Sequence, residues 1–162
     1  MRNHPDPAAV GTLLRHVHEL LDGDVAKVYE EQGLAEYRPR FSPVVRALLA
    51  EGPLPVRDLA AAVGVTHSAA SQTAAQMARA GLVTHTPDPG DARRRLVELT
   101  PKARALLPRI AAEWEATSAA MAELDAELPM PLAELLTQVA EAVRRRPFRE
   151  RIAAVYQPAY RP

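Results

Sequence analysis

The chain has 162 residues, enough for one compact domain or for a small binding domain with a helical platform. Hydrophobic residues make up 48% of it, aromatic residues 4%, and its formal net charge is zero. This composition is typical of a mostly helical protein and excludes a bulk polycation that coats nucleic acid, but it allows a local basic patch. The absence of cysteine excludes disulfides, thiolate catalysis and cysteine-ligated zinc.

No apolar run approaches the roughly 18 residues of a membrane span, and the first ten residues lack the apolar core of a signal peptide. We therefore expect a cytoplasmic protein with no membrane contact. A glycine-rich phosphate loop, a His-Glu-x-x-His motif and a nucleophile elbow are also missing. An enzyme, a metal site and a cofactor are accordingly not expected.

The first part of the chain has the spacing of three helices. Valine and leucine recur every three or four residues over residues 8–31, which predicts a long helix, with Gly23 as a weak point in its continuity. A connection rich in turn formers follows. A second helix is predicted over residues 41–50 and a short third one over residues 56–63.

A fourth helix is predicted from Thr66, whose hydroxyl can accept a backbone N–H, to a left-handed cap at Gly81. Two short strands, residues 82–86 and 93–99, flank a segment dense in turn formers. A helix then begins at the Thr100-Pro101 pair. The remaining helices are expected over residues 101–127, 132–146 and, as one or two further turns, 148–156.

The third and fourth helices are joined by about four residues that include Gly64. This is the spacing of a helix-turn-helix, whose second helix enters the major groove of DNA. We expect the two helices to be held together by apolar side chains of Leu59, Val63, Val65, Ala70 and Met77. The hairpin that follows would then be a wing.

The side chains expected on the outside of the fourth helix are Ser68, Ser71, Gln72 and Gln76, with no acid among them. A helix laid against polyanionic DNA avoids acids and keeps hydrogen-bonding groups for bases and phosphates. For the two glutamines, an ordinary surface helix explains the pattern about equally well.

The predicted hairpin carries three of the six basic residues of segment 41–100 in a row, Arg93, Arg94 and Arg95, preceded by Asp91. Focused positive charge on a hairpin suits phosphates or a narrow minor groove. The alternative is a hairpin whose arginines are only solvated.

The order and spacing of these segments resemble the MarR family of winged helix-turn-helix regulators. The helix-turn-helix part of the resemblance lies in Asp58-Leu59-Ala60, Val63-Gly64-Val65-Thr66, Ser68-Ala69, Ser71 and Ala80-Gly81-Leu82-Val83. The wing part lies in Asp88-Pro89, Asp91-Ala92-Arg93 and the segment from Val97 to Ala103. Together they extend over about 50 residues, and the flanking helices also fit the family plan.

The resemblance implies a mostly α fold with a β-hairpin wing. It divides the chain into an N-terminal dimerisation helix (1–40), a winged helix-turn-helix (41–100) and C-terminal dimerisation helices (101–162). The implied protein is a ligand-responsive homodimeric repressor on a pseudo-palindromic duplex operator. The candidate DNA-binding residues are Thr66, His67, Ser68, Ala69, Ser71, Gln72, Gln76, Asp91, Arg93, Arg94 and Arg95.

Within that set, the resemblance implies that Arg93 enters the minor groove and that Asp91 fixes its orientation. Family ligands lodge between the dimerisation helices and the DNA-binding region. The corresponding candidates for a small aromatic effector are His16, Tyr37, Phe41 and Trp114.

The chain departs from the family pattern at Gln72 and Gln76, where arginine is frequent, and at His67, where proline is frequent. Because glutamine reads adenine in bidentate fashion, we expect the base preference to shift from guanine toward adenine.

Two other classes of function compete with this prediction. A winged helix that binds a protein instead of DNA is favoured by the zero net charge, and disfavoured by the acid-free helix and the arginine-rich hairpin. An enzyme has little support. The run Arg144-Arg145-Arg146 is interpreted as a solvated helix end, with a dimer or DNA contact as the alternative.

Overall fold

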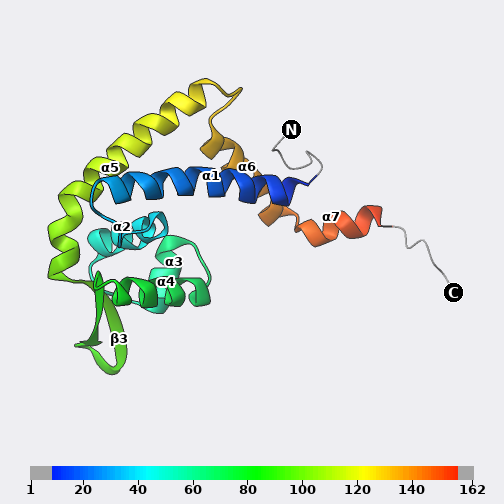
Figure 1. Cartoon of the computed structure of the whole chain (residues 1–162). Helices are drawn as coiled ribbons and strands as arrows, with labels where there is room; N and C mark the ends of the chain where they lie inside the picture. Colours follow the sequence, from blue (N-terminus) through cyan, green and yellow to red (C-terminus); the bar gives the residue numbers. More distant parts are fainter. Residues whose placement is uncertain (1–8, 157–162) are drawn as a thin grey trace. The chain divides into compact units, whose positions relative to one another are not determined.

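The computed structural model describes residues 9–156, so the first eight residues, which include most of the segment considered for a signal peptide, lie outside it. The chain divides into two compact units, residues 1–115 and 116–162. Figure 1 follows the elements in chain order. They are α1 (Val10–Glu31), η1 (Pro39–Phe41), α2 (Ser42–Glu51), β1 (Leu54–Pro55), α3 (Val56–Val63), α4 (His67–Arg79), β2 (Val83–Asp88), β3 (Asp91–Leu99), α5 (Pro101–Ala126), α6 (Leu132–Arg145) and α7 (Phe148–Val155).

Helix α1 is continuous through Gly23. Its one fully buried residue is Tyr29. Another side of the helix exposes Leu14 and Leu20, at 52% and 55% of their surface. The apolar stripe predicted for this segment is therefore only partly buried by the rest of the described chain.

The second helix begins one residue later than predicted. The expected helix over residues 41–50 is preceded by the 3₁₀ turn η1, with Pro39 at its first position, and α2 itself begins at Ser42. Proline suits such a first turn because its fixed φ is helical and its missing N–H would have had no partner there.

The sheet has three strands in the order β1-β3-β2, all antiparallel. The sequence predicted only two of them. Strand β1 pairs Leu54 with Val97 and Pro55 with Leu96. A strand of two residues has too short a sequence pattern to predict such a long-range pairing. Strand β2 continues through Pro87, which is tolerated because β2 is an edge strand.

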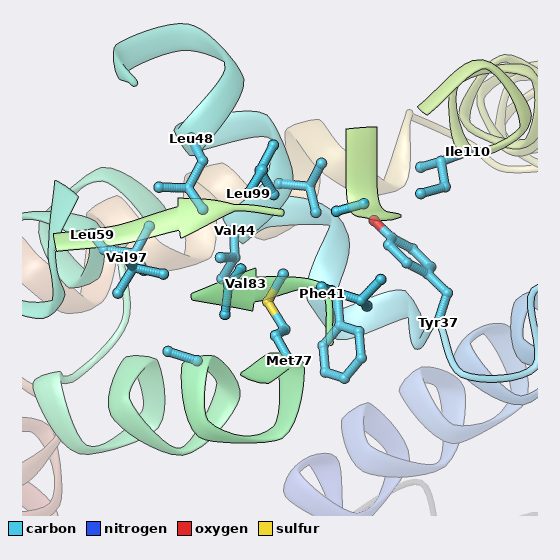
Figure 2. Close-up of a cluster of buried hydrophobic side chains, with 14 of the residues drawn as sticks. Tyr37, Phe41, Val44, Leu48, Leu59, Met77, Val83, Val97, Leu99 and Ile110 are labelled. Atoms are coloured by element: carbon cyan, nitrogen blue, oxygen red, sulfur yellow. The ribbon is translucent and has the colours of Figure 1, made fainter. Parts of the chain in front are cut away.

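The core of the first unit lies under the sheet. Figure 2 shows side chains from α2, α4 and the two long strands converging, among them Val44, Met77 and Val97. Each of these three is at most 2% exposed. The core therefore holds the helix-turn-helix and the base of the hairpin together.

The second unit contains the end of α5, α6 and α7. Asp125 accepts the backbone N–H of Leu132 at 2.9 Å, and Arg151 donates to the carbonyl of Ala142 at 3.0 Å, so one backbone group near each end of α6 has a side-chain partner. None of the helices in residues 9–156 combines the length and apolarity needed to cross a membrane.

Candidate nucleic-acid interface

The turn between α3 and α4 is built by local backbone chemistry. Gly64 caps α3 with φ 75°, a left-handed conformation that costs glycine little. The N–H of Val65 then returns to the carbonyl of Ala60 at 3.0 Å. Thr66 Oγ1 accepts the N–H of Ala69 at 3.2 Å, as the sequence predicted for the cap of α4.

The two helices pack through residues that are almost fully buried, Leu59, Ala70 and Met77. Val65 was predicted to join them, and that prediction is wrong, since 43% of its surface is exposed. Val65 lies in the turn itself, where the chain changes direction and its side chain faces solvent.

The exposed side of α4 is called the α4 outer face and consists of Ser68, Ser71, Gln72, Ala75 and Arg79. The predicted members Ser68, Ser71 and Gln72 are exposed, as are His67 and Ala69 in the first turn. Arg79 was missed, although the spacing 68, 72, 75, 79 places it on the same side. This face has polar groups, one cation and no acid.

Gln76 differs from Gln72, one turn away. It is half-buried, and its Oε1 is enclosed without a hydrogen-bond partner among residues 9–156. Gln76, predicted to project from the helix like Gln72, is therefore only partly exposed. Because a helix has 3.6 residues per turn, a residue four positions after Gln72 is rotated slightly around the helix, and Gln76 therefore lies at the edge of the buried side.

The wing turn is stabilised by two aspartates. Asp88 Oδ1 accepts the N–H of Gly90 at 2.8 Å, and Asp91 Oδ1 accepts the N–H of Arg93 at 3.0 Å. Asp91 thus holds the main chain at Arg93. The resemblance had implied that Asp91 fixes the orientation of Arg93.

The three wing arginines are all exposed, and they have different surroundings. Arg94 lies 3.4 Å from the carboxylate of Asp58 on α3. Within residues 9–156, no carboxylate lies within ion-pair distance of Arg93 or Arg95. In the described part of the chain, two of the three guanidinium groups therefore have no ion-pair partner.

Side chains at the start of α5 tie the wing to the end of α4. Thr100 Oγ1 donates to the carbonyl of Gly81 at 2.7 Å and accepts the N–H of Ala103 at 3.1 Å, so one hydroxyl caps α5 and holds the loop after α4. Lys102 donates to the carbonyl of Ala80 at 2.9 Å and also pairs with Glu36. The exit of α4 is consequently fixed to the start of α5, and Lys102 links it in turn to the loop after α1.

A buried polar cluster lies where α1, α2 and α5 meet, and sequence reasoning missed its central residue. Glu113 is 1% exposed and accepts a hydrogen bond from the hydroxyl of Tyr29. Ser42 Oγ lies 3.3 Å from the Tyr29 hydroxyl and 3.2 Å from the Tyr37 hydroxyl, and it accepts the indole N–H of Trp114 at 3.0 Å. Only the fold reveals this cluster, because its members are far apart in sequence.

The surroundings of the two tyrosines favour their neutral forms. Burial raises the pKa of Tyr37 to about 12. Burial, followed by the hydrogen bond to Glu113, raises the pKa of Tyr29 as well. Both phenols therefore act as hydrogen-bonding groups and not as acids at neutral pH.

The four residues predicted to hold an effector do not all meet. Tyr37 and Phe41 are buried with ring centroids 5.9 Å apart, and Trp114 lies beside them with the Arg46 guanidinium 4.0 Å over its ring. His16 is on α1, thirteen residues before Tyr29, about 20 Å along the helix axis. The aromatic trio thus forms one neighbourhood without His16.

In a comparison with protein families, residues 42–94 fit the model of the MarR family. The matched segment runs from the first residue of α2 to the arginines of β3, and so contains the helix-turn-helix and most of the wing. Comparison with curated proteins gives no match.

Solved structures of transcriptional regulators have the same fold. PcaV of Streptomyces coelicolor, solved with its natural ligand, is 22% identical over 86% of this chain and 92% of its own, with a TM-score of 0.62. BpsR of Bordetella bronchiseptica, whose DNA binding is regulated by 6-hydroxynicotinic acid, is 21% identical over 84% and 91%, with a TM-score of 0.61. A MarR-family regulator of Rhodococcus sp. RHA1 is 25% identical over 83% and 91%, with a TM-score of 0.53.

Proposed function

Because this chain carries the winged helix-turn-helix of the MarR family, we propose that it is a sequence-specific DNA-binding transcription regulator. The observation that carries the proposal is the acid-free α4 outer face beside two uncompensated wing arginines. A surface that meets polyanionic DNA needs this combination, and a solvated surface does not. The protein acts by binding, without catalysis, and in the cytoplasm.

In the proposed complex, α4 enters the major groove and its first turns meet bases and phosphates. Thr66, His67 and Ala69 lie at the N-terminal end of the helix, where backbone N–H groups favour a phosphate. Arg93 of the wing reaches the adjacent minor groove, and Arg79 adds a phosphate contact at the far end of α4. The enclosed Oε1 of Gln76 leaves Gln72 as the better candidate for bidentate reading of adenine.

We propose a homodimer formed by the helices outside the winged region. Exposed apolar side chains follow helical spacing on α1 and on α6, where Leu135, Val139 and Val143 are 40–49% exposed. Such stripes seldom stay in water. A symmetric dimer would place two α4 helices about one DNA turn apart, roughly 34 Å, on a pseudo-palindromic operator.

We also propose that a small aromatic effector releases the DNA, which makes the protein a ligand-responsive repressor. PcaV and BpsR both respond to or bind small molecules. The proposed site adjoins the aromatic trio of Tyr37, Phe41 and Trp114, from which α2 leads into the helix-turn-helix. An effector lowers DNA affinity only if it binds the two conformations with different affinity.

Fluorescence anisotropy with duplex DNA from upstream of the protein's own gene tests DNA binding directly. We expect sequence-selective binding that weakens steeply with salt, and a further loss of at least tenfold in Arg93→Ala. Arg38→Ala removes the same charge from the loop after α1 and is the matched control. If neither upstream nor randomised duplexes bind at low salt, the proposal fails and a protein-binding winged helix replaces it.

The single tryptophan provides a test of the effector site. Because the indole N–H of Trp114 is bonded within the polar cluster, an aromatic acid bound nearby should change its emission. We expect the same compound to weaken DNA binding at matching concentrations. Unchanged emission and unchanged DNA affinity across a panel of phenolic and aromatic acids would refute an effector at this site.

A further inference from the structure

Arg94 differs from Arg93 and Arg95 of the wing because it has an ion-pair partner, Asp58. Its guanidinium lies 3.4 Å from the carboxylate of Asp58, thirty-six residues earlier in the chain. Both side chains are about half exposed, at 48% and 49%. An acid this close to a DNA-binding wing opposes phosphate binding. Its presence there is explained if it has a structural role.

The pairing of β3 with β2 is irregular at the three arginines. Arg95 is the partner of Pro87, and the next pair joins Asp88 to Asp91, so Arg93 and Arg94 have no partner on β2. A bulge of this kind changes the direction of side chains relative to a regular strand. What separates the three arginines is their surroundings, because Arg94 lies beside Asp58 and, within residues 9–156, no carboxylate lies within ion-pair distance of Arg93 or Arg95.

Asp58 is placed to receive the side chain of Arg94. It lies in the first turn of α3, where an acid is favoured by the helix dipole. Strand β1 leads directly into that turn and pairs with β3 through Pro55 and Leu96. The base of the wing is thus already held beside α3, and the ion pair adds a second attachment closer to the tip.

We propose that Arg94 is a positioning residue that anchors the wing to α3 through Asp58, while Arg93 and Arg95 meet the DNA. The anchor limits how far the hairpin swings about its short pairing with β1. It holds the two remaining arginines at one angle relative to α4. The inference rests on the proposed DNA-binding function and assigns a role to a residue that the sequence had grouped with the contacts.

Asp58→Asn distinguishes the two possible roles of Arg94, DNA contact and wing anchor, because it changes DNA affinity in opposite directions under them. If Arg94 contacts DNA, removing a nearby acid frees it and strengthens binding. If Arg94 anchors the wing, the same substitution loosens the wing, and we expect affinity to fall about two- to tenfold although the protein becomes more positive. Asp58→Glu keeps the charge and should stay within about twofold of the unaltered protein.

A double-substitution cycle separates anchoring from general electrostatics. In an Arg94→Gln background the anchor is already lost, so Asp58→Asn should no longer weaken binding. Arg95→Ala is the comparison for a true contact, and it should reduce the slope of log affinity against log salt by about 0.9 for each wing. Arg94→Gln should change this slope by less than half as much.

Thermal unfolding of each variant verifies that the winged region is intact. Stronger binding by Asp58→Asn, or a salt-slope loss in Arg94→Gln equal to that in Arg95→Ala, would overturn the anchoring role and return Arg94 to the contacts. Failure of the unaltered protein to bind any duplex is a different result, because it removes the proposed function and not the wing geometry.

Discussion

The winged helix-turn-helix and the helices α1 and α6 use their apolar side chains in different ways. In the winged region, Leu59, Met77 and Val97 are completely buried, and the exposed side of α4 is polar. On α1 and α6, Leu20 and Val139 leave 55% and 49% of their surface exposed. The first region buries its apolar side chains within one chain, whereas α1 and α6 leave theirs partly exposed.

This difference is the one expected if the two regions meet different partners. Water, and in our proposal DNA, meets the winged region, so its surface has no apolar stripe. In our proposal the stripes on α1 and α6 are buried against a second copy. Stability should accordingly be intrinsic in one region and dependent on protein concentration in the other.

The largest expected effect is in the winged region. Leu59→Ala removes a fully buried side chain between α3 and α4 and leaves a cavity, so the free energy of unfolding should fall by about 2–5 kcal/mol. Chemical denaturation followed by circular dichroism measures this loss, which should be the same at every protein concentration. A loss that vanishes at high concentration would contradict the self-contained core.

The second effect concerns the apolar stripe of α6. Val139→Asp places a charge in the proposed dimer interface and should raise the dimer dissociation constant at least about 100-fold, or about 3 kcal/mol. Sedimentation equilibrium measures it. Thr137→Asp introduces the same charge on another side of α6 and should leave the dimer intact; equal effects of both variants would exclude α6 as the interface.

The smallest expected effect is a loss of stability at high pH, and it arises in the buried polar cluster of the first unit. Because folding raises the pKa of Tyr37 to about 12 and also raises that of Tyr29, the folded state favours the neutral phenols. Their stabilisation is complete below pH 10 and is lost as pH rises from 10 toward 12, by about 2–3 kcal/mol for Tyr37.

Unfolding measured between pH 8 and 12 tests this. Tyr37→Phe should be less stable than the unaltered protein at pH 8, and its stability should fall less steeply above pH 10. Ser42→Ala retains both phenols and is the control for loss of a hydrogen bond alone. Parallel pH profiles of Tyr37→Phe and the unaltered protein would show that burial does not shift this phenol.

Local chemistry made much of the winged region predictable. Val56–Val63 matches the predicted helix, Thr66 caps α4 and Thr100 caps α5, as expected. Caps and left-handed glycines act within three or four residues, so they can be recognised from the sequence alone. The exposed positions Ser68, Ser71 and Gln72 followed from helical spacing, and the same spacing contained Arg79, which was overlooked.

The sequence by itself determined the succession of helices, the turn of the helix-turn-helix and the cluster of positive charge on the hairpin. Only the tertiary structure decided the pairing of β1 with β3, the enclosure of the Gln76 amide oxygen and the burial of Glu113. It also decided that Arg94 lies within ion-pair distance of Asp58. The physical reason is that these contacts join residues distant in sequence, and their energies exist only once the core has brought the elements together.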